Sequence, residues 1–419
     1  MSYVTHLHCA KCGTNYPTDA KNYSCKTPNC GGRLDVEYDY ARMQGVLSRQ
    51  TLEARPLSVW TYFELLPVIN RANIVSLGEG GTPLLKSNRL AKALKLRHLY
   101  IKDETRNPTW SFKDRPMTVG VSKAKEHGAT TMASASSGNA AAALAAYCAR
   151  AGLACYTFVP DMAPMGKIAQ LVLYGAHVVR LRGSHKGDDP TVQLLRQACA
   201  AYGWTPCPSF GPFNPYQAEG PKTLGYEIIQ QLGWQVPDVV YVQVGAGGLL
   251  AGQWRGFTEF ATLDLVAKRP RIVAVQSTGC APLVRAYKSG ESPFKITPWQ
   301  APHSVAEGLC DPFPWDGDAA LTAVRDSRGT AVAVEDDLIL RAQTLLAKYE
   351  GVFAEPTGVT GLAGLLQQLE AGSQDPSETI VIEATGGGLK DQDTVIQSIK
   401  PPPVIDPDLQ QLRAALKLK

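Results

Sequence analysis

Residues 107–115 read NPTWSFKDR, and Lys113 within this stretch stands in a setting suited to covalent chemistry. An amine that forms an imine must be held beside a carbonyl group and stay within reach of the substrate. The neighbouring Ser111, Asp114 and Arg115 give this lysine polar surroundings. Taken alone, the stretch fits an ordinary surface lysine equally well, so its weight depends on the other motifs of the chain.

A second motif comprises Ser136, Ser137, Gly138 and Asn139, which follow a predicted strand and open an alanine-rich helix. Backbone N–H groups and the dipole at the start of a helix bind anions, here a substrate carboxylate. Asn139 could in addition reach the ring hydroxyl of a cofactor. A plain Ser/Asn helix cap, common in α/β proteins, is the alternative interpretation.

A third motif is the glycine-rich turn at residues 244–250, VGAGGLL, between a predicted buried strand and a helix. The backbone amides of such a turn can hold a phosphate group. The residues expected to do so are Gly245, Ala246, Gly247, Gly248 and Leu249. A dinucleotide-binding fingerprint fails because Leu250 occupies its third glycine position. A glycine packing turn without a ligand is the other alternative.

A fourth motif, residues 384–388 (ATGGG), places Thr385 at the C-terminal end of a predicted strand, where open α/β sheets bind ligands. A lysine for an imine, donors for a phosphate and a polar partner for a ring nitrogen are the requirements of pyridoxal phosphate. A hydroxyl beside that nitrogen, in place of a carboxylate, would leave the ring largely unprotonated. The sequence therefore predicts elimination or replacement chemistry rather than transamination, unless Thr385 is a simple turn residue.

The composition is that of a globular enzyme. The chain has 419 residues, of which 44% are apolar and 19% charged, with a formal net charge of +4. This length predicts two or three domains. We find no run of like charges that would bind nucleic acid, no apolar run that would span a membrane and no signal peptide. We therefore expect a cytoplasmic protein whose partners are small molecules, with neither nucleic acid nor membrane among them.

Four of the ten cysteines lie within the first thirty residues: Cys9, Cys12, Cys25 and Cys30. Two short cysteine turns separated by a hairpin's length of chain are typical of a structural zinc ribbon. Because all four positions would be protein thiolates, such a metal would stabilise the segment and would not catalyse. Four reduced thiols without a metal, or a nucleic-acid-binding ribbon, are the alternatives. The other six cysteines are predicted to be small core residues.

Beyond residue 83, apolar strand-like runs alternate with helical stretches, which favours an α/β fold with mainly parallel sheets. We predict a ribbon at residues 1–38, a large domain at 39–116 and 214–419, and a small α/β domain at 117–213. The predicted strands are 130–136, 153–159, 177–181, 239–244, 272–276 and 379–383. The predicted helices are 140–151, 166–174, 192–202, 219–232, 249–260, 336–349, 357–369 and an amphipathic tail helix at 409–418.

Together these motifs resemble the threonine synthase family of fold-type-II pyridoxal phosphate enzymes, whose fold is similar to tryptophan synthase β. The resemblance rests on stretches spread in order from residue 78 to residue 391. They are GEGGTPL (78–84), SFKDR (111–115), SSGN (136–139), NPY (214–216), EG with KT (219–223), EP (355–356) and GLKD (388–391). Some members of the family also carry the N-terminal ribbon.

The resemblance implies that Lys113 forms the internal aldimine, that Asn139 contacts the ring oxygen and that Thr385 faces the ring nitrogen. The loop at 245–249 would hold the cofactor phosphate, while Thr82 and residues 136–139 would bind the substrate. The implied reaction converts O-phospho-L-homoserine and water into L-threonine and phosphate, in a homodimer. A related enzyme performing β-elimination or β-replacement on O-phosphoserine, serine or threonine is the alternative. A zinc-ribbon binding protein built on a decayed enzyme scaffold is disfavoured because Lys113, Asn139 and Thr385 are retained.

Several positions depart from the family pattern. Trp110 and Pro116 replace the glycines that usually flank the lysine motif, and Gln217 replaces an arginine that often follows the Asn-Pro-aromatic triplet. Gly387 stands where many members have a histidine, and residues 304–315 also differ from the expected segment. The loss of a cation and a histidine weakens recognition of a phosphorylated substrate, whereas the cofactor assignment is unaffected.

Overall fold

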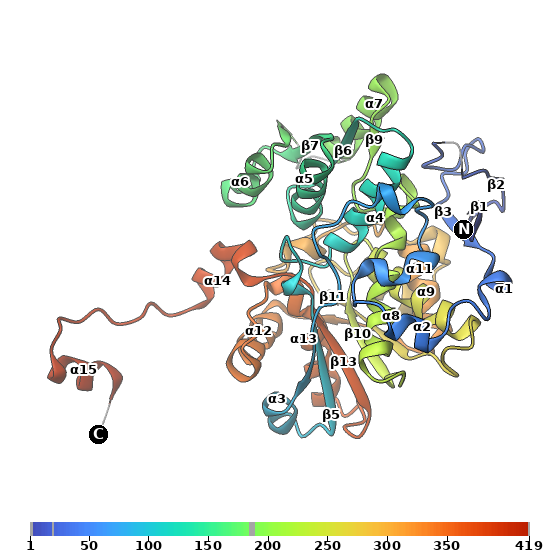
Figure 1. Cartoon of the computed structure of the whole chain (residues 1–419). Coiled ribbons are helices and arrows are strands. Elements are labelled where there is room, and N and C mark those ends of the chain that lie inside the picture. Colours follow the sequence, from blue (N-terminus) through green and yellow to red (C-terminus); the bar gives the residue numbers. More distant parts are fainter. Residues whose placement is uncertain (1–2, 19–20, 184–188, 418–419) are drawn as a thin grey trace.

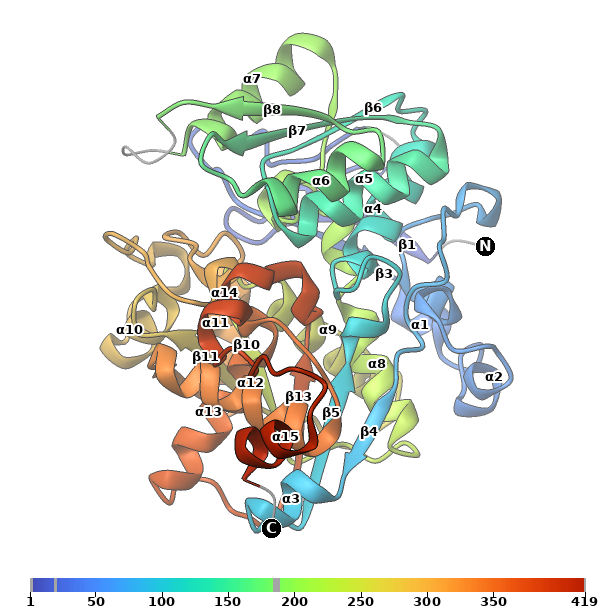
Figure 2. The ribbon, with the colours of Figure 1, turned by 90° about the vertical axis from the view of Figure 1, so that its left-hand side faces the viewer.

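The computed structural model describes residues 3–18, 21–183 and 189–417, and its described strands form three sheets (Figure 1). The first is a small antiparallel sheet of order β2-β1-β3. The second has six strands in the order β12-β11-β10-β13-β5-β4, and the third has four in the order β8-β7-β6-β9. Figure 2 shows the four-stranded sheet and its helices as an upper lobe above the six-stranded sheet. The α/β expectation is confirmed.

The six-stranded sheet forms the core of the lower lobe. Its strands are β4 (Leu84–Ser87), β5 (His98–Asp103), β10 (Val239–Gln243), β11 (Arg271–Ser277), β12 (Thr330–Val334) and β13 (Thr379–Ala384). All neighbouring strands pair in parallel except β4, which is antiparallel to β5. The helices packed on it include α8 (Lys222–Gln231), α9 (Gly248–Thr262), α12 (Asp336–Glu350) and α13 (Pro356–Glu370).

The buried run of β10 shows why this sheet is covered on both faces. Val240 and Val242 belong to the hydrophobic core formed with α8 and α9, whereas Val239 and Tyr241 belong to the core formed with α12 and α13. Successive side chains of a strand point to opposite faces, so a strand that is apolar at every position must be buried on both.

The four-stranded sheet is parallel throughout. Its strands are β6 (Thr131–Ser134), β7 (Ala154–Pro160), β8 (His177–Leu181) and β9 (Thr205–Pro206). The helices of this lobe are α4 (Asp114–Glu126), α5 (Asn139–Ala151), α6 (Met165–Leu173) and α7 (Pro190–Tyr202). The small alanine side chains of α5 are almost all buried and let this helix pack closely against its neighbours.

The N-terminal sheet packs against the lower lobe. It contains β1 (Val4–Cys9), β2 (Asn15–Tyr16) and β3 (Leu34–Tyr38). Several side chains connect it to that lobe. Among them, the Tyr38 hydroxyl donates to Glu219 at 2.7 Å, and Arg33 pairs with Asp318 at 3.3 Å. The ribbon therefore shares its core and its polar contacts with the enzyme body.

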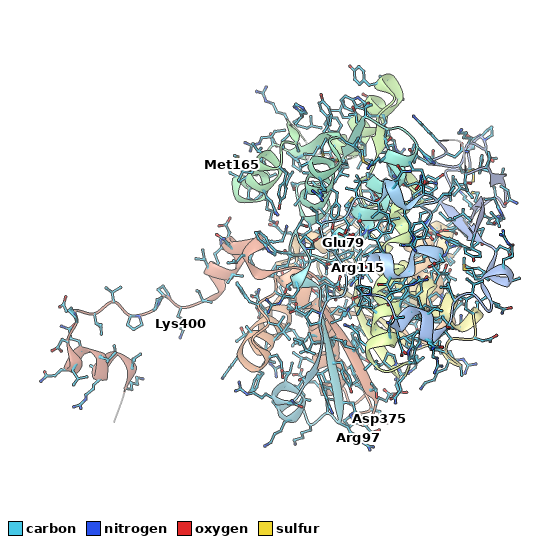
Figure 3. All side chains as sticks on the ribbon, viewed as in Figure 1. Glu79, Arg97, Arg115, Met165, Asp375 and Lys400 are labelled. Atoms are coloured by element: carbon cyan, nitrogen blue, oxygen red, sulfur yellow. The ribbon has the colours of Figure 1, made fainter. Side chains whose placement is uncertain are left out.

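The described part of the chain has further α-helices outside these groups. They are α1 (Tyr40–Met43), α2 (Arg49–Glu53), α3 (Arg89–Ala93), α10 (Pro282–Ser289), α11 (Gly317–Asp326), α14 (Gln392–Ser398) and α15 (Leu409–Leu416). Beyond α14 the chain leaves the body as an extended arm that includes Lys400 and ends in α15 (Figures 1 and 3). No helix in the described part of the chain is both long and apolar enough to cross a bilayer.

The predicted strands and helices agree with the observed ones within a few residues, with one larger difference. The helix predicted at 219–232 begins at Lys222, because a short 3₁₀ turn (Gln217–Glu219) precedes Pro221. Proline has no N–H and is accommodated at the start of a helix but not inside it. The elements that were not predicted include the strands β4, β5, β9 and β12 and the helices α3, α4, α10, α11 and α14. Residue 418 of the predicted tail helix lies outside the described residues.

Candidate active site

A cavity of about 370 Å³ opens where the C-terminal ends of strands from both larger sheets meet. The glycine-rich turn follows β10, Thr385 follows β13, and the turn at 136–139 follows β6. All three of these segments line the cavity together with Lys113. The chain thus brings four motifs that are far apart in sequence to one place, as expected for ligand sites in open α/β sheets.

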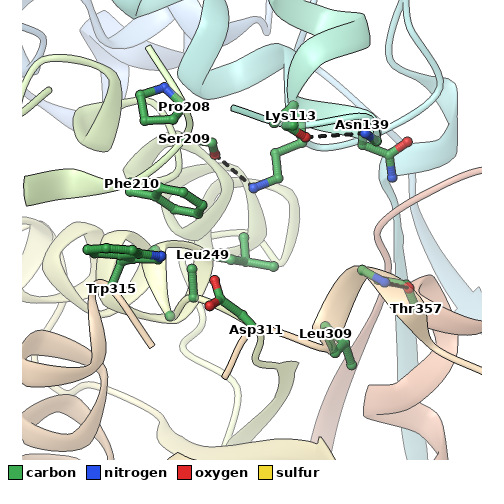
Figure 4. Close-up of a pocket in the computed structure, with 18 of the residues that line it drawn as sticks. Lys113, Asn139, Pro208, Ser209, Phe210, Leu249, Leu309, Asp311, Trp315 and Thr357 are labelled. Carbon is green, nitrogen blue, oxygen red and sulfur yellow. Dashed lines mark hydrogen bonds between the residues drawn. The ribbon is translucent and has the colours of Figure 1, made fainter. Parts of the chain in front are cut away.

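Lys113 points into this cavity from the start of α4 (Figure 4). Its ammonium donates a hydrogen bond to the Ser209 hydroxyl at 2.7 Å and lies 4.8 Å from the centre of the Phe112 ring. Burial lowers the pKa of Lys113 to about 8, although the carboxylates of Asp316 and Asp311 oppose the shift. A larger share of neutral amine near neutral pH makes this lysine a better nucleophile. The surface-lysine interpretation is excluded.

The loop before Lys113 is fixed by the turn that carries Thr385. The N–H of Phe112 donates to the Thr385 carbonyl at 2.9 Å, and the N–H of Gly387 donates to the Trp110 carbonyl at 2.8 Å. Trp110 has a φ of +64°, a left-handed conformation that favours glycine. This backbone conformation would suit the glycine that the family resemblance leads one to expect at the position of Trp110.

Two residues beyond Lys113, the guanidinium of Arg115 is fully buried between two carboxylates. It pairs with Glu104 at 2.6 Å and with Glu227 at 2.7 Å, and Lys102 also pairs with Glu227. Burial alone would raise the pKa of Glu227, but Arg115 and Lys102 outweigh it and lower the pKa to about 2. This network ties α4, and with it Lys113, to β5 and α8.

Thr82 belongs to the same network. Its hydroxyl donates to Glu104 at 2.5 Å and is itself contacted by Arg115 at 3.3 Å. Thr82 is not among the residues that line the cavity. In this structure the hydroxyl of Thr82 hydrogen-bonds buried charged groups, and its place in the substrate site stays a prediction.

The turn formed by Ser136, Ser137, Gly138 and Asn139 opens α5 at the cavity wall. No side chain caps the first turn of α5, so its backbone N–H groups remain available to an anion. The amide of Asn139 donates to the buried carboxylate of Glu355 at 2.7 Å. Burial raises the pKa of Glu355, with Lys390 and Asn139 acting against the shift. Glu355 was not predicted as a site residue.

The glycine-rich turn from Gly245 to Leu249 leads directly into α9. Gly247 has a φ of +101°, and no side chain caps the first turn of the helix. A Cβ atom at Gly245 would lie 3.0 Å from the Gly308 carbonyl, so the wall is tight there. Uncapped amides at a helix start in a tight glycine turn are the donor set that a phosphate group needs. The residues present therefore fit the phosphate of the predicted cofactor.

Thr385 is buried, and its hydroxyl accepts a hydrogen bond from the side-chain amide of Gln243 at 2.7 Å. Since that bond occupies a lone pair, the hydroxyl proton remains free to be donated. A donor at this position suits an unprotonated ring nitrogen. Gln243, which orients the hydroxyl, was not predicted either.

Ser209, which accepts from Lys113, has a φ of +70° and depends on Gln217. The Gln217 side chain accepts from the Ser209 N–H at 3.1 Å and from the Cys207 thiol at 2.9 Å, and donates to the Phe210 carbonyl at 2.9 Å. Gln217 is thus an internal support of the cavity wall. The family resemblance implies an arginine at this position, and the glutamine found here instead makes three internal hydrogen bonds.

Asp311 and Asp316 are among the further acidic residues that line the cavity. Burial raises the pKa of Asp311 to about 7 and that of Asp316 to about 6. Asp316 accepts from the Gly211 N–H at 3.0 Å, and its own N–H donates to the Ala246 carbonyl at 2.7 Å. Asp316 therefore joins the glycine-rich turn to the wall that carries Ser209. Neither residue lies in a recognisable motif, and sequence reasoning missed both.

The four N-terminal cysteines come together in the ribbon. Their sulfur atoms all lie within 4.8 Å of one another, and the pairs Cys9–Cys30 and Cys12–Cys25 are each separated by 3.6 Å. A tetrahedral zinc ion with bonds of about 2.3 Å requires sulfur–sulfur distances of about 3.8 Å. Gly13 and Gly31 have φ values of +75° and +59°, as expected for tight turns after cysteines. The geometry fits zinc.

Comparisons with known proteins agree with this geometry. The family described as pyridoxal-phosphate dependent enzyme matches residues 75–386. A protein named threonine synthase from Methanocaldococcus jannaschii is 40% identical over 410 residues, which is 98% of each chain. A protein of the same name from Methanosarcina acetivorans is 40% identical over 412 residues, again 98% of each chain.

Two solved structures share the fold. Serine racemase from maize has a TM-score of 0.64 at 24% identity and covers 76% of this chain and 91% of its own. Threonine deaminase isoform 2 from Solanum lycopersicum has a TM-score of 0.66 at 22% identity and covers 82% of this chain and 94% of its own. At these identities the likeness concerns the fold alone, and it confirms the predicted fold-type-II architecture.

Proposed function

Since the chain belongs to the threonine synthase family of pyridoxal-phosphate-dependent enzymes, we propose that it converts O-phospho-L-homoserine and water into L-threonine and phosphate. The observation that carries the proposal is the meeting of Lys113, Asn139, Thr385 and the turn at 245–249 around one cavity. Identity over nearly the full length of both chains supports the substrate. β-Elimination or β-replacement on O-phosphoserine, serine or threonine remains the alternative.

Each part of the cofactor has a counterpart in the cavity. Lys113 would hold its aldehyde carbon covalently, the amides of 245–249 its phosphate, and Thr385 its ring nitrogen. Asn139 would contact the ring oxygen while its amide also bonds Glu355. When bound, pyridoxal phosphate draws electrons away from the substrate Cα, so that protons at Cα and Cβ become acidic.

The chain's own residues would then bind the substrate and move its protons. The uncapped N-terminus of α5 would hold the substrate carboxylate. The Lys113 amine would take protons from Cα and Cβ and return protons at Cγ and Cα, a task suited by its lowered pKa of about 8. Ser209, at 2.7 Å, would keep that amine oriented between transfers. Phosphate leaves from Cγ and water adds at Cβ to complete L-threonine.

The experiment that tests this function is incubation of the yellow holoenzyme with O-phospho-L-homoserine. Released phosphate is measured and the amino-acid product is identified by NMR. Phosphate with stoichiometric L-threonine supports the proposal. No turnover, with the cofactor spectrum still changing on addition of O-phosphoserine, serine or threonine, would favour the alternative substrates instead.

The lowered pKa of Lys113 predicts how fast the apoenzyme takes up its cofactor. Only the neutral amine attacks an aldehyde, and a group with a pKa of about 8 is mostly protonated below that pH and mostly neutral above it. We expect the rate of covalent attachment of pyridoxal phosphate to rise between about pH 7 and 9 and then level off. Stopped-flow absorbance across this range measures it. A rate still rising steeply beyond about pH 10 would indicate an ordinary lysine pKa.

We propose that the ribbon binds structural zinc through Cys9, Cys12, Cys25 and Cys30. Their spacing and the mutual distances of their sulfur atoms support this. We expect the Cys12→Ser variant to lose the metal and to have a lower midpoint of thermal unfolding, because metal binding and folding of such a segment are linked. Cofactor absorbance should persist. Metal analysis and calorimetry test this, with Cys199→Ser, a cysteine outside the cluster, as the control.

We also propose the division into a ribbon (1–38), a large cofactor-binding domain (39–116 and 214–419) and a small domain (117–213). The positions of the larger sheets support this division, since the strands of the four-stranded sheet all lie between residues 131 and 206. The cytoplasm is proposed as the compartment, because thiolate ligands for zinc require reduced cysteines.

A homodimer is proposed from an exposed apolar face on α6 and the turn before α14. Met165, Leu173 and Leu389 are 61%, 86% and 67% exposed, and Met165 lies on the outer side of α6 (Figure 3). Lys390 joins the two segments through its hydrogen bond to Gln170. Exposed apolar faces of this kind commonly mark subunit contacts. We expect Leu173→Asp to shift the mass measured by light scattering from dimer to monomer, whereas an unchanged mass would place the contact elsewhere.

A further inference from the structure

The cavity is short of positive charge for a phosphorylated substrate. Among the described residues that line it, the cationic side chains are those of Lys113 and Lys167. The carboxylates that line it are those of Asp189, Asp311, Asp316, Glu307 and Glu355. A phosphate ester carries close to two negative charges at neutral pH and needs a cation or several donors to enter such surroundings. Because Lys113 would be bound covalently to the cofactor, Lys167 is the cation of this lining that can pair with the substrate phosphate.

Lys167 and the glycine-rich turn line the cavity from different elements, α6 and the start of α9. Lys167 belongs to α6 in the upper lobe (Figure 2), whereas its partner Glu307 belongs to a 3₁₀ turn (Glu307–Leu309) in the lower lobe. Its ammonium pairs with the Glu307 carboxylate at 2.5 Å. Both residues line the cavity, so the pair connects the two lobes at its wall.

The two partners are unequally exposed. The Lys167 side chain retains 20% of its accessible surface, whereas that of Glu307 retains 60%. Burial alone disfavours the ammonium, but Glu307, Asp391 and Glu355 outweigh it and raise the pKa of Lys167. The lysine is thus charged, held at the cavity, and bound to a carboxylate that can turn into solvent. Ion pairs with an exposed partner contribute little, so an entering dianion can replace Glu307 readily.

A neutral donor lies beside this pair. Thr357 lines the cavity at the start of α13, and its hydroxyl accepts from the N–H of Gly308, the residue after Glu307, at 3.1 Å. Because this bond uses an acceptor position, the hydroxyl proton of Thr357 is free for an anion. Thr357 and Lys167 could therefore contact the same phosphate group from two sides.

We propose that Lys167 is the residue that recognises the γ-phosphate of the substrate. In the absence of substrate, the carboxylate of Glu307 pairs with the Lys167 ammonium at the position where the phosphate would bind. This inference rests on the proposed function and names the group that selects its substrate. It assigns to Lys167 the role that the neutral Gln217, occupied by internal hydrogen bonds, cannot perform. Replacement of Glu307 by the phosphate would also bring the substrate into contact with both lobes.

The test compares two substrates in the holoenzyme. One is O-phospho-L-homoserine, and the other is L-vinylglycine, the unphosphorylated amino acid with the carbon skeleton that remains after phosphate leaves. Lys167→Gln should raise the KM for O-phospho-L-homoserine by roughly 10- to 100-fold, the loss of one charge-assisted hydrogen bond. The ratio of kcat/KM between the two substrates should fall by the same factor. Lys167→Arg should restore most of that ratio.

Glu307→Gln should act in the opposite direction. The neutral glutamine no longer competes with the substrate phosphate for the Lys167 ammonium. The variant should therefore bind the phosphorylated substrate about two- to fivefold more tightly. Lys268→Gln is the matched control, since Lys268 also forms an exposed ion pair, with Asp238 at 3.0 Å, at the opposite end of β10. This control should leave the ratio of the two substrates unaltered.

A binding measurement separates this inference from the proposed function. Calorimetric titration of the holoenzyme with inorganic phosphate should show binding that weakens in Lys167→Gln and strengthens in Glu307→Gln. If the wild type converts neither substrate but this phosphate pattern holds, the proposed function fails and the Lys167 site stands. If Lys167→Gln weakens both substrates equally, or leaves phosphate binding unaltered, the inference is overturned.

Discussion

Lys113→Ala is expected to abolish L-threonine formation, with a loss of at least about 10³-fold in kcat. The variant loses both the covalent link to the cofactor and the amine that moves protons at Cα and Cβ. The fold should persist, because the buried contacts of this segment come from Asp114 and Arg115 rather than from the lysine. Activity assays and circular dichroism measure the two effects.

The covalent link has its own readout. After reduction with borohydride, mass spectrometry of the wild type should place the cofactor on the peptide that contains Lys113, and the Lys113→Ala chain should carry none. Lys113→Arg is the matched control, because it keeps the positive charge but cannot form an imine. A cofactor adduct that survives on the Lys113→Ala chain would assign the covalent role to another lysine.

Arg115→Met is expected to lower the free energy of unfolding by about 3–5 kcal/mol. The substitution leaves Glu104 and Glu227 buried without their main counterion, since both carboxylates pair with the guanidinium at 2.6–2.7 Å and are fully buried. Lys102 can neutralise only part of that charge. Because this network fixes the start of α4, cofactor binding at Lys113 should weaken as well.

Arg106→Met provides the comparison for Arg115. Arg106 pairs with Asp103 at 3.1 Å, but its side chain is 66% exposed, so its loss should cost less than about 1 kcal/mol. Urea unfolding followed by fluorescence compares the two variants under the same conditions. Equal destabilisation by both substitutions would mean that the buried network does not hold the active-site helix in place.

The cofactor motifs could be found from the sequence because each consists of residues that lie close together along the chain. A glycine turn such as 245–249, or the Ser-Ser-Gly-Asn start of α5, needs a particular backbone shape and particular residue types within a few positions. Their order after strands also predicted that they lie at the C-terminal edge of a sheet, where the structure has them. The same reasoning identified the cysteine cluster. The short spacing within each pair of cysteines predicts two tight turns that together form one site.

The supporting residues could not be found in this way. Ser209 contacts Lys113 across 96 residues of sequence, and Glu355 contacts Asn139 across 216. Ser209 stands in no motif, and Glu355, although it lies in the EP stretch at 355–356, was not predicted to contact the site. At position 217 the sequence showed only the absence of a cation, whereas the structure shows three hydrogen bonds from Gln217 to the cavity wall. Thr82 illustrates the converse, since a residue within a family motif contacts buried charges instead of the cavity.

The sequence by itself determined the fold class, the lysine and the turns suited to a phosphorylated cofactor, because these depend on local backbone geometry and on hydrophobic periodicity. Only the tertiary structure decided which charges surround the lysine, how far its pKa moves, and which cation is left for a phosphorylated substrate. Those properties arise from burial and from contacts between distant segments. Electrostatic interactions act through space, so the order of residues along the chain does not specify them until the chain is folded.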